Sequence, residues 1–282
     1  MKRNMIRRKS LEPRSAAEAE PDPRDGGVQS VDRALSIIET LAEDDEGYRL
    51  SDLAVRTGLS TSTVHRLLAT LEKRRFVQFD RDESKWHVGA QSFSVGATFA
   101  RRRNFTAQAM PYLRKLRDQT RETANLAVVD DESIIVLTRI ESREIMRSLT
   151  KVGGRVAMVA SGVGKAVLAT YADEDVNAII CRQGMPRLTE KSIVRPGELF
   201  KELEAIRRRG YAVDDEEARM GLRCIAAVVY NDCSEPLAAI SVSGMTSRIT
   251  DERLPVLGCI VRQVAAELTV VLGGVIPPEQ VS

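Results

Sequence analysis

The feature that most constrains the fold of this 282-residue chain is the segment from Leu50 to Leu71, which has the pattern of a helix-turn-helix. Gly58 stands between two helical stretches, and a glycine there can end the first helix in the left-handed conformation at little steric cost. Ser51 is placed to cap the first helix and Ser60 to cap the second. The segment therefore predicts two short helices joined by a tight turn. The buried stripe of the second helix is expected to comprise Val64, Leu67, Leu68 and Leu71.

The opposite face of the second helix is polar at its N-terminal end. The residues predicted on that face are Thr61, Ser62, Thr63, His65 and Arg66. Short polar side chains there can approach base edges in the major groove of DNA, and a helix N-terminus favours phosphate. We expect these residues, together with Ser51 and Ser60, to contact DNA. Helix pairs of this kind also occur in ordinary helical bundles, so the pattern needs support from its surroundings.

A predicted β-hairpin directly after the second helix supplies that support. Residues 76–80 and 85–88 flank the polar turn 81–84 and alternate in polarity. A recognition helix followed by a hairpin makes a winged helix-turn-helix, so residues 29–90 are predicted to form a DNA-binding domain. Its first helix is expected to be amphipathic, with Val31, Leu35, Ile38 and Leu41 at helical spacing. Phosphates, which position a protein without specifying sequence, are expected to meet Arg74, Arg75 and Arg81.

The rest of the chain is predicted to comprise tails, a linker and a second domain. Residues 1–28 are polar and contain three prolines, which indicates a disordered tail, and a second tail is expected at 275–282. Residues 91–104 predict a linker helix whose apolar face packs between domains or subunits. Residues 105–274 mix helices with short apolar strands, which predicts an α+β domain whose helices cover an antiparallel sheet. The expected strands are 126–129, 134–137, 145–150, 211–213, 224–229 and 237–243, and the expected helices cover 110–120, a stretch beginning near 161, 199–209 and 254–272.

Composition narrows the chemistry. The two histidines lie in the first third of the chain and the four cysteines in its second half, so neither a His/Cys metal site nor a histidine-based triad is expected, and no cofactor is implied. The cysteines lack CxxC spacing, no run of 18 apolar residues occurs, and the start of the chain has no apolar signal core. We therefore expect a cytoplasmic protein with reduced thiols and no membrane partner.

The charge of the chain is nearly balanced, with 42 basic and 40 acidic side chains. Residues 1–104 carry 19 basic and 16 acidic residues, so the predicted DNA-binding part is only weakly positive. Because phosphate contacts supply much of the affinity of a DNA-binding protein, a single copy is expected to bind DNA weakly. We therefore expect a homo-oligomer that binds a double-stranded operator through two copies.

Taken together, the sequence resembles the IclR family of bacterial transcription regulators over residues 29–272. The resemblance is carried, in order along the chain, by residues 28–35, 53–71, 161–166, 210–217, 221–226 and 239–244. It implies a winged helix-turn-helix domain, a GAF-like effector-binding domain, and dimers or tetramers. It also implies a regulator that senses a small organic molecule, often a carboxylate. The family includes both repressors and activators, and we expect a repressor.

The resemblance also places an effector site in the second domain. It implies contacts from Gly162 and Val163 and from the polar residues Asp214, Cys224, Ser241 and Ser243. It puts Ile145, Ser148, Val156 and Leu222 on the walls. Ser148 and Val156 stand where larger apolar groups are common in the family, so we expect a roomier or more polar pocket.

Elementary chemistry gives these positions separate meanings. The backbone N–H groups at the start of the helix near Ser161 can cradle a carboxylate, although the glycines there could instead serve only close helix–sheet packing. Ser241 and Ser243 lie two apart on a strand and therefore face the same side. A buried Asp214 would repel an anionic ligand, so its carboxyl group must be protonated or screened. Lys165 could pair with the ligand or be a solvated surface charge.

Two other functions compete with a ligand-controlled regulator. A GAF-type thiol enzyme would use Cys224, but an enzyme needs a matched nucleophile and base, and no histidine or second cysteine lies near it in sequence. A sensory module that binds a protein partner through its helices is the other alternative. A small buried thiol is the plainer interpretation of Cys224.

Overall fold

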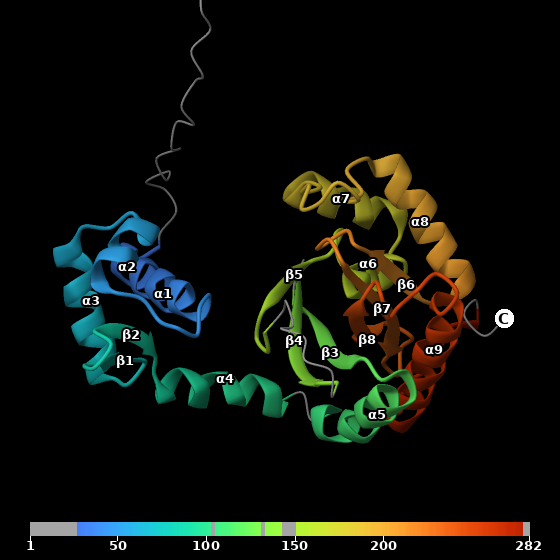
Figure 1. The fold of residues 1–282 in the computed structure, drawn as a ribbon, viewed down its shortest axis with the longest axis horizontal. Coiled ribbons are helices and arrows are strands. Elements are labelled where there is room, and N and C mark those ends of the chain that lie inside the picture. Colours follow the sequence, from blue (N-terminus) through green and yellow to red (C-terminus); the bar gives the residue numbers. More distant parts are fainter. Residues whose placement is uncertain (1–26, 103–104, 131–132, 143–150, 279–282) are drawn as a thin grey trace, which may run out of the picture. The chain divides into compact units, whose positions relative to one another are not determined.

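The computed structural model describes residues 27–102, 105–130, 133–142 and 151–278 (Figure 1). The chain divides into two compact units, Met1–Ala97 and Thr98–Ser282. The division falls within helix α4 (Ala90–Arg102), which occupies the stretch predicted as a linker. Phe93 and Val95 on this helix are exposed. Of the tail predicted at 1–28, all but the last two residues lie outside the described part of the chain.

The first unit contains three helices and a two-stranded hairpin. Its elements are α1 (Gln29–Ala42), α2 (Leu50–Thr57), α3 (Thr61–Lys73), β1 (Val77–Asp80) and β2 (Lys85–Val88). Strands β1 and β2 pair in antiparallel fashion, as predicted for the wing. Tyr48 and Trp86 exchange backbone hydrogen bonds of 3.1 and 2.8 Å, which attach the wing to the loop before α2. The core of this unit is formed mainly by Ile37, Leu41, Leu53, Val64, Leu68, Val77 and Trp86.

The turn between α2 and α3 follows the predicted capping chemistry with one exception. Gly58 ends α2 in the left-handed region with φ 66°, and the Ser60 hydroxyl accepts a hydrogen bond from the N–H of Thr63, so both predictions are confirmed. The prediction for Ser51 is wrong. Helix α2 begins one residue before it, with Arg49 as its cap, and the Ser51 hydroxyl donates instead to the carboxylate of Asp52.

The apolar stripe of α1 differs from the one suggested by spacing alone. Ile37 and Leu41 fill the core, whereas Val31 and Leu35 are more than half exposed. Residues 37 and 41 lie one helical turn apart on the face toward α2 and α3, and residues 31 and 35 lie on another face. The sequence therefore predicts the helix correctly but assigns part of its apolar surface to the wrong side.

The second unit is built on a six-stranded antiparallel sheet with strand order β5-β4-β3-β8-β7-β6. The strands are β3 (Thr123–Asp130), β4 (Ser133–Ile140), β5 (Arg155–Ala157), β6 (Ala212–Asp215), β7 (Leu222–Tyr230) and β8 (Pro236–Met245). Strands β3 and β8 are neighbours although more than 100 residues separate them in sequence. Five of the six predicted strands appear, and the one expected at 145–150 lies outside the described residues.

Helices cover both faces of this sheet (Figure 1). The helices α5 (Phe105–Thr120) and α9 (Leu254–Val271) share one core with it, and α6 (Gly162–Leu168), α7 (Asp173–Gln183) and α8 (Pro196–Arg209) share the other. Successive residues of β7 alternate between the two cores, as the two-residue repeat of a strand requires. The α+β architecture predicted from the sequence is thus present. Helix α7 and the short edge strand β5 were not predicted.

The last part of the chain consists of the apolar helix α9 and a short segment after it. Helix α9 is long and apolar enough to cross a membrane by length and composition. Its Leu257, Val261, Val264 and Leu268 side chains are buried in the core it shares with α5 and the sheet, which is the place of a core helix. Beyond it, the N–H of Val275 donates to the carbonyl of Asn231, so the chain still contacts the unit at the start of the expected tail.

Candidate functional site

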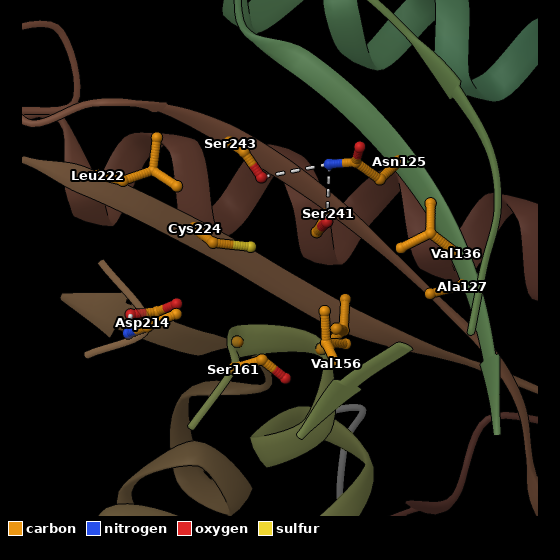
Figure 2. A pocket seen from close by; sticks show the side chains of 13 residues that line it. Asn125, Ala127, Val136, Val156, Ser161, Asp214, Leu222, Cys224, Ser241 and Ser243 are labelled. Carbon is orange, nitrogen blue, oxygen red and sulfur yellow. Dashed lines mark hydrogen bonds between the residues drawn. The ribbon is translucent and has the colours of Figure 1, made fainter. Parts of the chain in front are cut away.

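A small cavity of about 90 Å³ lies between the sheet of the second unit and the start of α6 (Figure 2). Eight of the ten residues predicted to bind an effector line it: Val156, Gly162, Val163, Asp214, Leu222, Cys224, Ser241 and Ser243. The other two, Ile145 and Ser148, lie outside the described residues. Segments far apart in sequence thus form one pocket.

Strand register explains why the polar residues meet. Asp214 of β6 pairs with Cys224 of β7, and Cys224 pairs with Ser243 of β8, so the three form one row across the sheet. Ser241 is opposite Asn125 of β3 in the next row. All five lie on the sheet face that turns toward α6, where apolar side chains fill the core farther along the same strands.

Asn125 is a polar lining residue that the sequence reasoning missed. Its side-chain amide nitrogen donates to the hydroxyl oxygens of Ser241, at 3.3 Å, and Ser243, at 3.2 Å (Figure 2). The signal available was an asparagine directly before the predicted strand 126–129. The structure places it inside β3, where asparagine is uncommon. Ala127 and Val136 form an apolar wall at the end of the cavity away from Asp214 (Figure 2).

The start of α6 distinguishes the two functions proposed for its glycines. A Cβ at Gly162 would lie 3.2 Å from the sulfur and carbonyl oxygen of Cys224, so this glycine keeps the cavity open. A Cβ at Gly164 would lie 2.1 Å from the carbonyl oxygen of Met158, so that glycine permits close backbone packing. The hydroxyl of Ser161 accepts from the N–H of Gly164. Among the described residues, the N–H groups of Gly162 and Val163 have no partner, and α6 itself is only seven residues long.

Asp214 is the acidic group among the lining residues that the structure describes. Only 4% of its surface is exposed, and its Oδ1 accepts hydrogen bonds from the N–H groups of Glu217, at 2.8 Å, and Ala218, at 3.2 Å. Burial, and then the nearby charge of Glu217, raise the pKa of Asp214 to about 6, against the lowering effect of these hydrogen bonds. The side chain therefore changes its charge near neutral pH.

Lys165 is not a solvated charge, one of the two alternatives that the sequence offers, and it is not among the residues that line the cavity. Its side chain is fully buried and forms an ion pair with Oε1 of Glu217. Burial raises the pKa of Glu217 despite this ion pair, and its Oε2 is buried without a hydrogen-bond partner. The buried ammonium group of Lys165 thus lies near two buried carboxyl groups, Glu217 and the pocket residue Asp214.

Cys224 contributes a thiol to the pocket wall. Burial, followed by the charge of Asp214, raises its pKa to about 11, so the sulfur stays protonated at neutral pH. A protonated thiol is a weak nucleophile, which disfavours the thiol-enzyme alternative. Within the described residues, no cluster of His, Cys, Asp and Glu side chains could hold a metal ion.

The predicted DNA-contacting residues lie in two groups on the first unit. Ser60, Thr61, Ser62, His65 and Arg66 are exposed around the start of α3. Thr63 is half-buried, and its hydroxyl oxygen lies 2.8 Å from that of Ser60. Ser51, His65 and Arg81 line one groove between α2, α3 and the wing. The structure therefore brings the wing arginine close to the exposed face of α3.

Arg74 and Arg75 form the second group, at the other end of α3. Both are exposed, and Arg74 is the C-cap of the helix. Thirteen helical residues separate them from Ser60, which corresponds to roughly 20 Å at 1.5 Å per residue. They can meet a phosphate at a distance from the helix start, but they do not share its surface.

Comparison with known proteins identifies the family. A model of the IclR helix-turn-helix domain matches residues 30–81, and a model of the C-terminal domain of the bacterial transcriptional regulator IclR matches residues 97–270. The chain belongs to the IclR family. Its first unit is the helix-turn-helix domain of that family, and its second unit is the C-terminal IclR domain.

Relatives cover nearly the whole chain. The acetate operon repressor of Salmonella typhimurium is 41% identical over 254 residues, 89% of this chain and 93% of the repressor. The transcriptional repressor AllR of Escherichia coli is 34% identical over 256 residues, 91% of this chain and 94% of AllR. A solved IclR homologue from Microbacterium hydrocarbonoxydans, complexed with 4-hydroxybenzoate, shares the fold with a TM-score of 0.72 at 22% identity, covering 86% of this chain and 98% of the homologue. The first two of these relatives are named repressors, that is, regulators of transcription rather than enzymes.

Proposed function

We propose that this IclR-family protein is a cytoplasmic repressor whose affinity for its operator is controlled by a small organic carboxylate bound in the pocket of the second unit. The sign of regulation is inferred from the two relatives, both of which are named repressors. The carboxylate is inferred from the chemistry of the pocket.

The observation that carries the effector proposal is the convergence of hydrogen-bond donors. The hydroxyls of Ser241 and Ser243 meet on one side of the cavity, where the Asn125 amide donates to both oxygens and leaves their hydrogens to donate. The N–H groups of Gly162 and Val163 lie at the start of α6. Carboxylate oxygens accept hydrogen bonds from such groups. The apolar wall of Ala127, Val136 and Val156 suits the carbon skeleton of a small acid. The ligand of the Microbacterium homologue, 4-hydroxybenzoate, is itself a carboxylate.

The DNA side of the proposal assigns different tasks to the two groups on the first unit. The residues at the start of α3, from Ser60 to Arg66, are proposed to contact base edges in the major groove. Ser51 and Arg81 line, together with His65, the groove on the protein between α2, α3 and the wing. They are proposed to bind the DNA backbone next to the bases that α3 contacts. Arg74 and Arg75 are proposed to bind phosphate farther along the duplex.

Control by the effector is proposed to act as a shift between two populations of a homo-oligomer. Two recognition helices must match the spacing of two half-sites on the operator. An effector that binds one arrangement of the linker helices more tightly than another changes the fraction of molecules with the correct spacing. Dimers and tetramers both meet this requirement.

The test is binding of the purified protein to DNA from around its own gene, over a salt series and with competitor DNA. The proposal predicts a discrete complex that resists competitor and leaves a palindromic footprint. Small carboxylates added to that complex are predicted to change its affinity. Binding that ignores sequence and vanishes with modest salt would indicate phosphate contacts alone and would contradict base reading at the start of α3.

A further inference from the structure

The polar groups that line the pocket are unequal in what they can offer a carboxylate. Ser241, Ser243 and the thiol of Cys224 each carry a hydrogen to donate, while the Asn125 amide already donates to the two serine oxygens. Asp214 is the one carboxyl group among the described lining residues. When ionised it can only accept, so it meets an anionic ligand as a like charge.

The groups around Asp214 do not cancel its charge. From α6 it faces Lys165, and from the turn after β6 it faces Glu217. From β7 comes the protonated thiol of Cys224, and β8 and β3 contribute uncharged side chains. Lys165 is already paired with Glu217, so among the described residues the ionised cluster has two carboxylates for one ammonium group. An anionic effector would add a further negative charge to a buried cluster that already has an excess of one.

Asp214 also lies beside the start of α6. A Cβ placed on Gly162 would be 3.6 Å from the Cβ of Asp214, so ligand atoms next to Gly162 lie within contact distance of this side chain. Both described hydrogen bonds to Asp214 end on Oδ1. They leave Oδ2 as the oxygen that can carry a proton toward the cavity.

We propose that Asp214 takes up one proton when a carboxylate effector binds, so that the pocket accepts a monocarboxylate together with a proton. The proton removes the like charge and turns Asp214 into a donor to the ligand oxygen. This inference rests on the proposed function of the pocket as a carboxylate site.

A definite pH dependence follows. The pKa of Asp214 is raised to about 6 in the free protein, so above that pH the side chain is mostly ionised before binding. If the bound state holds the proton, binding weakens with rising pH and approaches a tenfold loss per pH unit well above 6. Between pH 6 and pH 8 the apparent Kd is therefore expected to rise roughly 50-fold.

The experiment is titration calorimetry of the full-length protein between pH 6 and pH 8.5, in buffers of different ionisation enthalpy. The probes are acetate, propionate, benzoate and 4-hydroxybenzoate, with benzamide as an uncharged counterpart. The acid that binds is expected to take up close to one proton at pH 8. Benzamide, if it binds, is expected to take up none. These readouts use the wild-type protein and do not depend on any variant folding.

Two variants assign the proton to a residue. D214N can keep the Oδ1 acceptor for Glu217 and Ala218 but cannot ionise, so its Kd for the acid is expected to be nearly independent of pH and lower than that of wild type at pH 8. D215N is the matched control. Asp215 is adjacent on β6 but pairs with Arg223 and Lys191, which lower its pKa, so this variant is expected to keep the wild-type slope.

The outcomes separate this inference from the proposed function. Carboxylate binding without proton uptake, or an unchanged slope in D214N, would overturn the inference and leave the carboxylate site intact. Failure of every acid to bind to a protein that still binds its operator would overturn the proposed effector class and the inference with it.

Discussion

Asp214 is a carboxyl group held in a cavity wall by two backbone N–H groups, and its environment affects stability as well as binding. The folded protein raises its pKa from the ordinary 3.8 to about 6, so the folded state binds this proton more tightly than the unfolded state. Linkage then requires that the free energy of unfolding falls as the pH rises from about 4 to above 6. The contribution is largest in acid and absent at neutral pH.

This fall in the free energy of unfolding with rising pH gives a prediction for D214N in the absence of any ligand. Between pH 5 and pH 7.5, wild type is expected to lose about 1 kcal/mol of unfolding free energy relative to D214N, because only wild type loses the proton. Urea denaturation at the two pH values measures the difference. An equal change in both proteins would show that Asp214 titrates near its ordinary pKa.

Single pocket residues show where sequence reasoning stops. Ser241 and Ser243 were placed on one side by the two-residue repeat of a strand, which is a local property. The burial of Lys165 depends on Glu217, 52 residues away, and the position of Asn125 matters because β3 pairs with β8. Such long-range partners are not contained in any local pattern, and this is why Lys165 was misjudged and Asn125 was missed.

At the scale of elements, α3 is defined by its cap. The Ser60 hydroxyl accepts from the N–H of Thr63, whereas Ser51 is not a cap in α2. S60A is therefore expected to lower the free energy of unfolding of the first unit by about 1 kcal/mol, and S60N to preserve it. S51A is the matched control, with an expected change within about 0.5 kcal/mol.

The only tryptophan, Trp86, is buried in the core of the first unit and reports its unfolding by fluorescence. Denaturant titrations of the three variants against wild type measure the changes. Equal losses in S60A and S51A would contradict the difference in capping between the two helices.

The two ends of α3 are expected to differ in what they do to DNA. H65A removes a side chain proposed to reach base edges, so it should reduce the ratio of operator to competitor affinity. R74A removes a proposed phosphate contact, so it should weaken both affinities alike and reduce the salt slope by about 1. Binding titrations over a salt series distinguish the two. Loss of discrimination in R74A with none in H65A would reverse the assignment.

The elements that could be predicted from sequence have either clear end signals or a long apolar stripe. Helix α3 has Gly58 before it and Ser60 as its cap, and α9 has a long apolar stripe. Helix α7 begins after Ala172 without a side-chain cap, and few of its residues are buried, so its pattern resembles a polar loop. The edge strand β5 is three residues long, which is too short for a periodic signal.

At the scale of the whole molecule, the chain joins a DNA-binding unit and a unit with a small-molecule pocket through the stretch that contains α4. Two units could be predicted from sequence because the helix-turn-helix pattern ends where the longer α+β pattern begins. The strand order of the six-stranded sheet could not, because neighbours such as β3 and β8 are distant in sequence. The central claim is that occupancy of the pocket in one unit changes DNA binding by the other.

The most direct measurement is the affinity for operator DNA with and without a bound carboxylate, in wild type and in G162V. A valine side chain at position 162 would occupy space next to Cys224 and Asp214 and block the pocket. G197A is the control, since Gly197 lies on α8 with open space around it.

Wild type and G197A are predicted to lose about tenfold or more in operator affinity when the acid is present. G162V is predicted to bind the operator as wild type does and to ignore the acid. An operator affinity that stays constant while the acid occupies the pocket, or a full response in G162V, would contradict the account.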